Sequence, residues 1–173
     1  MDLEIKLKIS KPETCCEDFS AFFPIDIRLL WKIKGHDRPD YYFARPESPI
    51  SYNGGTYNHL VLSTHDEKDS LIGFLKPIAA HIALVTDDSA LEDASLNSVK
   101  IENVAVCLIE RRERRYDALR KLAHIGNAEA QYFLARCYYD GAECTKNNNK
   151  ALWWLKESAN KGFYPAKKLL YNL

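Results

Sequence analysis

The sequence has no long hydrophobic run and few glycines or prolines. Its longest apolar run, residues 78–85, is far shorter than the ~20 residues that a membrane-spanning helix needs. The opening residues do not join a basic segment to an apolar block, so we expect no secretory signal and a cytoplasmic protein. The composition, 46% apolar and 28% charged, is ordinary for a soluble globular chain. The 173 residues allow one large domain or two small ones.

Paired cysteines are also missing, because the five cysteines are irregularly spaced and fit neither a disulfide framework nor a zinc motif. No phosphate-binding glycine loop or nucleophile elbow is present. We therefore expect no metal, no cofactor and no catalytic residues. The densest group of chemically active side chains fits no zinc spacing, and we interpret it as the solvated end of a hairpin: His59, His65, Asp66, Glu67 and Asp69.

The net charge of zero conceals a split between the two parts of the chain. Residues 1–112 carry 18 acidic and 13 basic side chains, a net charge of −5, whereas residues 113–173 carry 6 and 11, a net charge of +5. The basic side chains of the second part are spread around the predicted helices. Nucleic-acid binding proteins collect such side chains in one stripe, so we expect no nucleic-acid partner.

The first part of the chain is dominated by strand patterns. Apolar and polar residues alternate over residues 3–9 and again over 25–33, which predicts two half-buried strands. The dipeptide Asn53-Gly54 predicts a tight hairpin turn, and we expect residues 60–62 to be its return arm. Further strands are predicted at residues 41–44 and 99–109.

Three other segments of this part are harder to assign. Residues 11–24 are rich in proline, cysteine and acid, so we predict an irregular connection. Asp69 or Ser70 can cap a short helix that ends before Pro77. Residues 78–85 are consistent with a buried strand or a buried helix. Taken together, residues 1–110 are predicted to form a small, mostly antiparallel α+β domain.

The hydrophobic period changes from 2 to 3.6 after a charged junction at residues 110–115. Helices are predicted at residues 113–125, 128–139, 149–160 and 165–172. Asn127 and Asn148 are the expected N-caps, and Gly126 and Gly162 the expected stops. The fold class is therefore α+β, a β-rich domain followed by an all-α segment.

The helical part repeats itself with an offset of 36 residues, which carries Leu119 to Leu155 and Ala130 to Ala166. A fixed period of this length is typical of stacked helical hairpins. Residues 130–141, 150–155 and 159–162 together resemble a Sel-one-like repeat, an α/α family related to the tetratricopeptide repeat. The resemblance covers about residues 116–173 and implies a protein-interaction scaffold without catalytic residues.

Three residues depart from the pattern of this family: Ala135 replaces a usual glycine, Glu143 replaces the second glycine of the turn, and Cys144 replaces an aliphatic residue. One full unit with two flanking halves is also shorter than the three or more units that a stacked array needs. We therefore predict that residues 113–173 dock on the N-terminal domain.

The helix predicted from residue 128 has one apolar stripe, which we expect to be core: Ala130, Leu134, Cys137 and Tyr138. The remaining positions point elsewhere: Gln131, Tyr132, Ala135, Arg136 and Tyr139. In related repeats this helix lines the concave surface, so Tyr132, Arg136 and Tyr139 are the candidate protein-binding residues. The alternative is that the tyrosines pack on the N-terminal domain. Trp154 is expected in the core, and Trp153 is expected to be exposed or to cover the docking seam.

These observations favour a non-enzymatic protein-binding protein. By family analogy, our first hypothesis is a bacterial immunity protein that neutralises a cognate toxin. Its acidic residues Asp87, Asp88, Glu92 and Asp93 would then face a basic toxin surface, although a solvated loop also explains them. One alternative is an adaptor or scaffold in bacterial signalling or secretion. Another is a small hydrolase or transferase domain that carries a regulatory repeat arm.

Overall fold

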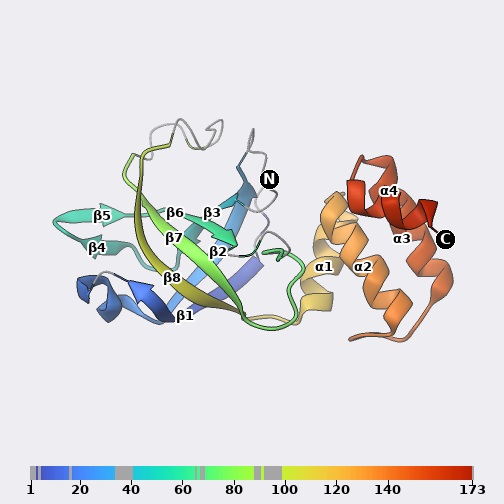
Figure 1. The fold of residues 1–173 in the computed structure, drawn as a ribbon, viewed down its shortest axis with the longest axis horizontal. Coiled ribbons are helices and arrows are strands. Elements are labelled where there is room, and N and C mark those ends of the chain that lie inside the picture. Colours follow the sequence, from blue (N-terminus) through green and yellow to red (C-terminus); the bar gives the residue numbers. More distant parts are fainter. Residues whose placement is uncertain are drawn as a thin grey trace. The chain divides into compact units, whose positions relative to one another are not determined.

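The computed structural model describes residues 3, 5–15, 17–33, 41–64, 66, 69–87, 91 and 99–172. It divides the chain into two compact units, Met1–Arg112 and Glu113–Leu173. We call them the barrel unit and the helical unit and describe each by itself. Strands lie in the barrel unit and the α-helices of the described chain lie in the helical unit (Figure 1), which confirms the α+β fold class.

Six strands of the barrel unit form a closed barrel in the order β1-β2-β3-β6-β7-β8. Every neighbouring pair is antiparallel. A separate two-stranded hairpin, β4 (Ile50–Tyr52) with β5 (Gly55–Tyr57), lies between β3 and β6 in the sequence. A 3-10 helix, Glu17–Phe22, follows the first strand. The barrel strands are β1 (Ile5–Cys15), β2 (Ile25–Lys32), β3 (Tyr41–Pro46), β6 (Leu60–Thr64), β7 (Ile78–Val85) and β8 (Ile101–Arg111).

The barrel interior is filled by apolar residues that are register partners across neighbouring strands. Leu29 pairs with Ala44, Ala44 with Leu60, and Leu60 with Leu84. Register partners share one face of a sheet, so these side chains form a single layer. All four are fully buried. Ile5 on β1 and Ile109 on β8 are also buried, so all six barrel strands contribute to the core.

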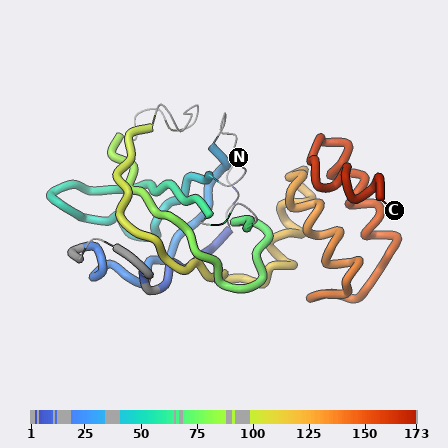
Figure 2. Tube along the Cα trace, viewed as in Figure 1, coloured from blue at the N-terminus to red at the C-terminus, as the bar shows by residue number. Residues whose placement is uncertain are grey.

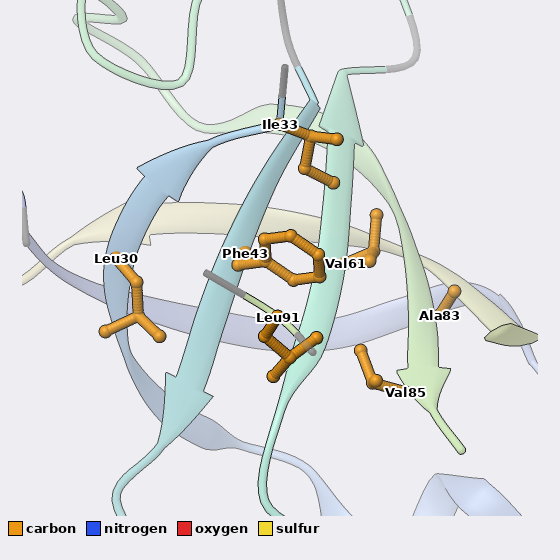
Figure 3. Close-up of a cluster of buried hydrophobic side chains, with 7 residues drawn as sticks. All are labelled: Leu30, Ile33, Phe43, Val61, Ala83, Val85 and Leu91. Carbon is orange, nitrogen blue, oxygen red and sulfur yellow. The ribbon is translucent and has the colours of Figure 1, made fainter. Parts of the chain in front are cut away.

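A second apolar cluster covers the outer face of one part of the barrel wall (Figure 3). Phe43, Val61 and Ala83 are register partners and alternate with the interior residues. Leu91, from the connection between β7 and β8, packs with them. The strands β3 and β6 and the second half of β7 are thus largely buried on both faces, which explains why residues 82–85 show no alternation of apolar and polar side chains. The whole cluster consists of Leu30, Ile33, Phe43, Val61, Ala83, Val85 and Leu91.

The predicted hairpin has its turn where expected but a different return arm. Asn53 and Gly54 adopt positive φ angles of 47° and 77°, and Tyr52 pairs with Gly55 directly across the turn. The prediction that residues 60–62 return the hairpin was wrong. β6 pairs instead with β3 and β7, because a two-residue turn brings the next residues back at once.

The helix predicted from residue 69 is a turn at residues 71–73. Ser70 does act as a local cap, since its Oγ accepts hydrogen bonds from Ile72 N–H and Gly73 N–H at 3.2 and 2.9 Å. The Arg111 guanidinium donates to the carbonyls of Ile72 and Phe74. These two carbonyls thus accept hydrogen bonds from a side chain that is distant in the sequence, and not from the backbone N–H groups of a helix.

Residues 11–15, predicted as irregular, continue β1. The pairing of β1 with β8 shifts register on both sides of Pro12. Proline lacks the N–H of a regular ladder and is tolerated at such bulges. The strand therefore extends through a residue that the sequence pattern treats as a break.

The helical unit consists of α1 (Arg115–His124), α2 (Ala128–Asp140), α3 (Asn148–Asn160) and α4 (Tyr164–Tyr171). Consecutive helices contact one another, and Figure 2 shows the chain turning back between one helix and the next. Asn127 caps α2 as predicted, accepting a hydrogen bond from Ala130 N–H at 2.8 Å. Asn147, not the predicted Asn148, caps α3, accepting from Lys150 N–H at 2.9 Å.

Candidate functional site

A groove of about 570 Å³ lies between α2, α3 and α4 in the helical unit. Its floor is apolar and comes mainly from α3, with Leu169 added from α4. Arg136 and Tyr139, two of the three residues predicted to bind a partner, line its α2 side. The lining residues are Ala135, Arg136, Tyr139, Asp140, Asn148, Ala151, Leu152, Leu155 and Leu169.

Large apolar side chains are exposed along this groove. Tyr139 is 52% exposed and Leu152 is 42% exposed, whereas Leu155 on the floor is buried. Exposed apolar side chains that gather around a concavity are typical of an interaction site. The groove therefore presents a surface that another molecule can cover.

The charged residues of the groove are paired with each other. Arg136 and Asp140 form an ion pair at 3.5 Å, one helical turn apart on α2. Hydrogen bonding to Tyr132 raises the pKa of Arg136, and the nearby Asp140 carboxylate also raises it. The Lys146 ammonium lies 5.5 Å from the centre of the Tyr139 ring. These contacts orient the α2 wall of the groove.

The loop between α2 and α3, which closes one end of the hairpin, is held by Glu143. This residue adopts a positive φ of 65°, at the position where the repeat pattern has its second glycine. Its carboxylate accepts a hydrogen bond from Tyr116 N–H at 2.8 Å and pairs with Arg115 at 3.4 Å. Arg114, the N-cap of α1, makes no side-chain capping hydrogen bond, so Glu143 supplies that acceptor.

The third candidate, Tyr132, does not line the groove. Its ring packs against Phe133 and Phe163, with centroids 5.2 and 5.5 Å apart. Asp87 is exposed in the barrel unit. The other acidic candidates, Asp88, Glu92 and Asp93, lie outside the described residues. Whether any of the candidates binds a partner stays a prediction.

Two α2 residues predicted to point away from the core are in fact buried. Gln131 is 3% exposed and donates from Nε2 to the Ala123 carbonyl at 3.1 Å. Ala135 is 4% exposed. Helix α2 is buried on two sides because it contacts both α1 and α3. Core positions predicted on α2 are confirmed: Ala130, Leu134, Cys137 and Tyr138 are buried.

The tryptophan pair divides as predicted. Trp154 is 7% exposed and meets the His124 ring edge to face at 5.2 Å, while Trp153 is 55% exposed. Cys137 lies buried in the same unit. Burial raises the pKa of its thiol to about 11, so it is a poor nucleophile at neutral pH.

The histidine and carboxylate cluster of the barrel unit gathers no metal site among the residues that the structure describes. His59 lies beside Arg45, with ring Nε2 and guanidinium nitrogen 3.4 Å apart. The two flank a surface pocket of about 410 Å³ together with Glu47 and Asn58. His65 and Glu67 lie outside the described residues. In the described chain no helix is long and apolar enough to cross a membrane.

The apolar floor of the groove was missed by sequence reasoning. Leu152, Leu155 and Leu169 follow ordinary helical spacing, which does not separate a core residue from a groove residue. The signal that could have found them is the 36-residue offset, because it compares each position with its counterpart in the neighbouring hairpin.

Comparison with known proteins identifies part of the helical unit. Residues 128–163 match the family model of the Sel1 repeat. The match spans α2, α3 and the turn before α4, and it confirms the resemblance over that segment. No curated protein and no solved structure matches the chain. The matched repeat is a non-enzymatic module that suggests protein–protein interaction.

Proposed function

We propose that this chain is a protein-binding protein whose partner occupies the groove between α2, α3 and α4. The observation that carries the proposal is the pair of exposed apolar side chains, Tyr139 and Leu152, beside the buried Ala151 and Leu155 in one concavity. Tyrosine and arginine are enriched among the residues that contribute most to binding energy. Both line this groove.

The character of the groove supports a protein partner over a small molecule. Its volume, about 570 Å³, falls in the range of ligand pockets. Small-molecule sites usually add a few convergent polar groups to fix the orientation of the ligand. Here Arg136 and Asp140 pair with each other. Apolar contact and shape are what the floor offers, as in the buried centre of a protein interface.

The test is capture of a partner by the full chain and its variants at near-native expression in the native host. Tyr139→Ala and Leu152→Glu should each reduce capture at least ~10-fold, because each removes or disrupts apolar contact in the groove. Tyr164→Ala is the matched control, since Tyr164 is 72% exposed and does not line the groove. Full capture by both groove variants would contradict the proposal.

Within this function we propose that the partner is a cognate toxin and that the chain neutralises it in the cytoplasm. The support is the analogy with repeat-containing immunity proteins and the net charge of −5 on residues 1–112, which suits a basic toxin surface. Co-expression with the product of the neighbouring gene tests it. Rescue of growth by the full chain supports the immunity function, and capture without rescue favours an adaptor.

A further inference from the structure

A row of basic side chains crosses three neighbouring strands of the barrel unit. Lys6 on β1 is the register partner of Arg28 on β2, and Arg28 is the register partner of Arg45 on β3. All three are exposed, and each lies between two buried residues of its strand. We call these three residues the basic row. Register partners have Cβ atoms about 4.5–5.5 Å apart, so the three charges form a line on the outer face of the barrel.

The basic row is not neutralised by the carboxylates near it. Like charges directly opposite one another in a sheet are destabilising. In the described part of the chain, no ion pair joins Arg28 or Arg45 to a carboxylate. The next row of the same face differs, because Asp26 on β2 lies opposite Lys8 on β1 and bonds to Arg112. Charges are thus balanced one row away, whereas two arginines of the basic row face each other.

The basic row ends at a concave pocket. His59 directly precedes β6, and its ring Nε2 lies 3.4 Å from a guanidinium nitrogen of Arg45. The guanidinium has five N–H donors, and the Asn58 amide adds two more, so the pocket can bind a carboxylate even though Glu47 also lines it. The pocket has a volume of about 410 Å³ and is lined by Arg45, Pro46, Glu47, Pro49, Asn58 and His59.

We infer that the basic row binds a helical segment of a protein partner that carries one carboxylate per turn. Side chains one turn apart on a helix have Cβ atoms about 5–6 Å apart, close to the separation of register partners on neighbouring strands. Successive carboxylates of such a segment therefore face Lys6, Arg28 and Arg45, and the one at Arg45 reaches the pocket beside His59. The basic row lies on the barrel unit and the groove on the helical unit, so this inference does not depend on the proposed function.

Charge favours a short acidic segment over a nucleic acid or an anionic membrane. Residues 1–112 carry a net charge of −5, so the basic row is a narrow positive strip on a negative unit. Duplex DNA carries one negative charge per about 1.7 Å of its length, and an anionic membrane presents a broad negative surface. The rest of the unit repels both of these, whereas an acidic segment can contact the strip alone.

The test measures binding of a fluorescent helical peptide, with glutamate at every fourth position, to the full chain by fluorescence anisotropy. The same peptide with glutamine instead of glutamate should not bind. Arg28→Glu should weaken binding of the glutamate peptide at least ~10-fold, because it sets a like charge against the peptide. Lys100→Glu is the matched control, since Lys100 is also exposed and lies outside the basic row. This control should change binding by less than about 2-fold, because distant surface charges are screened.

A stability measurement separates lost binding from lost folding. Arg28→Glu places a carboxylate between Lys6 and Arg45, so it should raise the thermal midpoint of the barrel unit by about 2 °C or more while binding falls. Arg45→Gln removes one cation without reversing its charge and should weaken binding about 3-fold. If Arg28→Glu does not fold, Arg45→Gln decides the outcome by itself.

Three results would overturn the inference. The first is no binding of the glutamate peptide at concentrations up to about 1 mM. The second is an equal loss of binding in Arg28→Glu and Lys100→Glu. The third is tighter binding of oligothymidylate or of phosphatidylserine vesicles that Arg28→Glu abolishes, because the row would then bind a nucleic acid or a membrane. Unchanged capture by Tyr139→Ala and Leu152→Glu would contradict only the proposed function, so the two proposals fail separately.

Discussion

Glu143 occupies a backbone conformation that a glycine adopts at lower cost. A non-glycine residue in the left-handed region is strained, and φ at Glu143 is 65°. The side chain explains why glutamate stands there: it accepts a hydrogen bond from the first turn of α1 and pairs with Arg115, which is 8% exposed. One residue thus fixes the α2–α3 loop and caps a helix far away in the sequence.

Replacing this side chain should destabilise the helical unit. Glu143→Ala keeps the strained backbone and removes the acceptor, so we expect a loss of about 2 kcal/mol in the free energy of unfolding. Urea denaturation followed by circular dichroism measures it. Asp140→Ala is the control, because its pair with Arg136 leaves both side chains almost half exposed and should contribute less than about 1 kcal/mol. Equal losses in both variants would contradict the capping role.

Asp26 gives the barrel unit a defined response to acid. Arg112 holds it through two hydrogen bonds of 2.6 and 2.9 Å, and this bonding lowers the pKa of the carboxyl group. A group whose pKa is lower in the folded state stabilises the fold above its unfolded pKa, near 3.9. That stability is lost as the pH falls through the folded pKa.

Asp26→Asn should therefore weaken the dependence of the free energy of unfolding on pH. We expect the original chain to be more stable than the variant at about pH 6 and the difference to be smaller at about pH 2.5. Urea midpoints at both pH values measure this difference. A gap that stays constant across this range would show that the ionisation of Asp26 does not matter to the fold.

At the scale of the elements, the sequence predicted the N-cap of α3 one residue away from its observed position. The pattern Asn147-Asn148-Asn149 offers three similar cap residues in a row, and the sequence alone does not rank them. The structure ranks them, because only the residue with extended backbone before the first turn can present its side chain to the N–H two or three residues on. Asn147 has that conformation, with φ −153° and ψ 98°.

The neighbouring asparagines make a matched pair for a test of the cap. Asn147→Ala should cost about 1 kcal/mol of stability, because the N–H of Lys150 loses its acceptor. Asn148→Ala should change stability by a few tenths of a kcal/mol at most. Thermal unfolding of the full chain compares them. A larger loss for Asn148→Ala would place the cap where the sequence predicted it.

Local sequence patterns predicted the strands with one solvent-exposed face and the helices of the helical unit well. They failed where distant residues decide the structure. Residues 82–85 are buried on both faces, so they carry no alternation. Leu60 on β6 pairs with β3 and β7 instead of with the nearby hairpin. The Arg111 side chain hydrogen-bonds to carbonyls that a helix at residue 72 would need. Each of these contacts is invisible in a local window.

The candidate site was predicted in part. Tyrosine and arginine on one predicted helix indicated Arg136 and Tyr139, and both line the groove. Tyr132 was included because the pattern of a single helix does not show that Phe163, which directly precedes α4, packs on it. The floor on α3 depends on how α2 and α4 pack beside it, which the pattern of a single helix does not show.

At the scale of the whole molecule, the helical unit has too few repeats for a self-supporting array. Stacked arrays generally need about three or more units, and the described helices make two hairpins with an offset of 36 residues. The opposite net charges of the two parts, −5 and +5, are consistent with the docking predicted from the sequence. We propose that the barrel unit stabilises the helical unit.

This proposal predicts that residues 113–173 are less stable alone than in the chain. A fragment with these residues should unfold at a lower temperature than the helical signal of the full chain, by about 4 °C for each kcal/mol lost. Circular dichroism and analytical ultracentrifugation make the comparison. A soluble, monomeric fragment that unfolds cooperatively at the same temperature would rule the docking out.

Closure of the barrel limits how a partner can bind to the barrel unit. Each barrel strand has a neighbour on both sides, so the barrel offers no free edge to which a foreign strand could add. Among the described residues, the strands with an open edge are β4 and β5, which have three residues each. A partner strand thus finds few unpaired backbone groups on this unit. A partner would instead contact side chains on its faces and in its grooves.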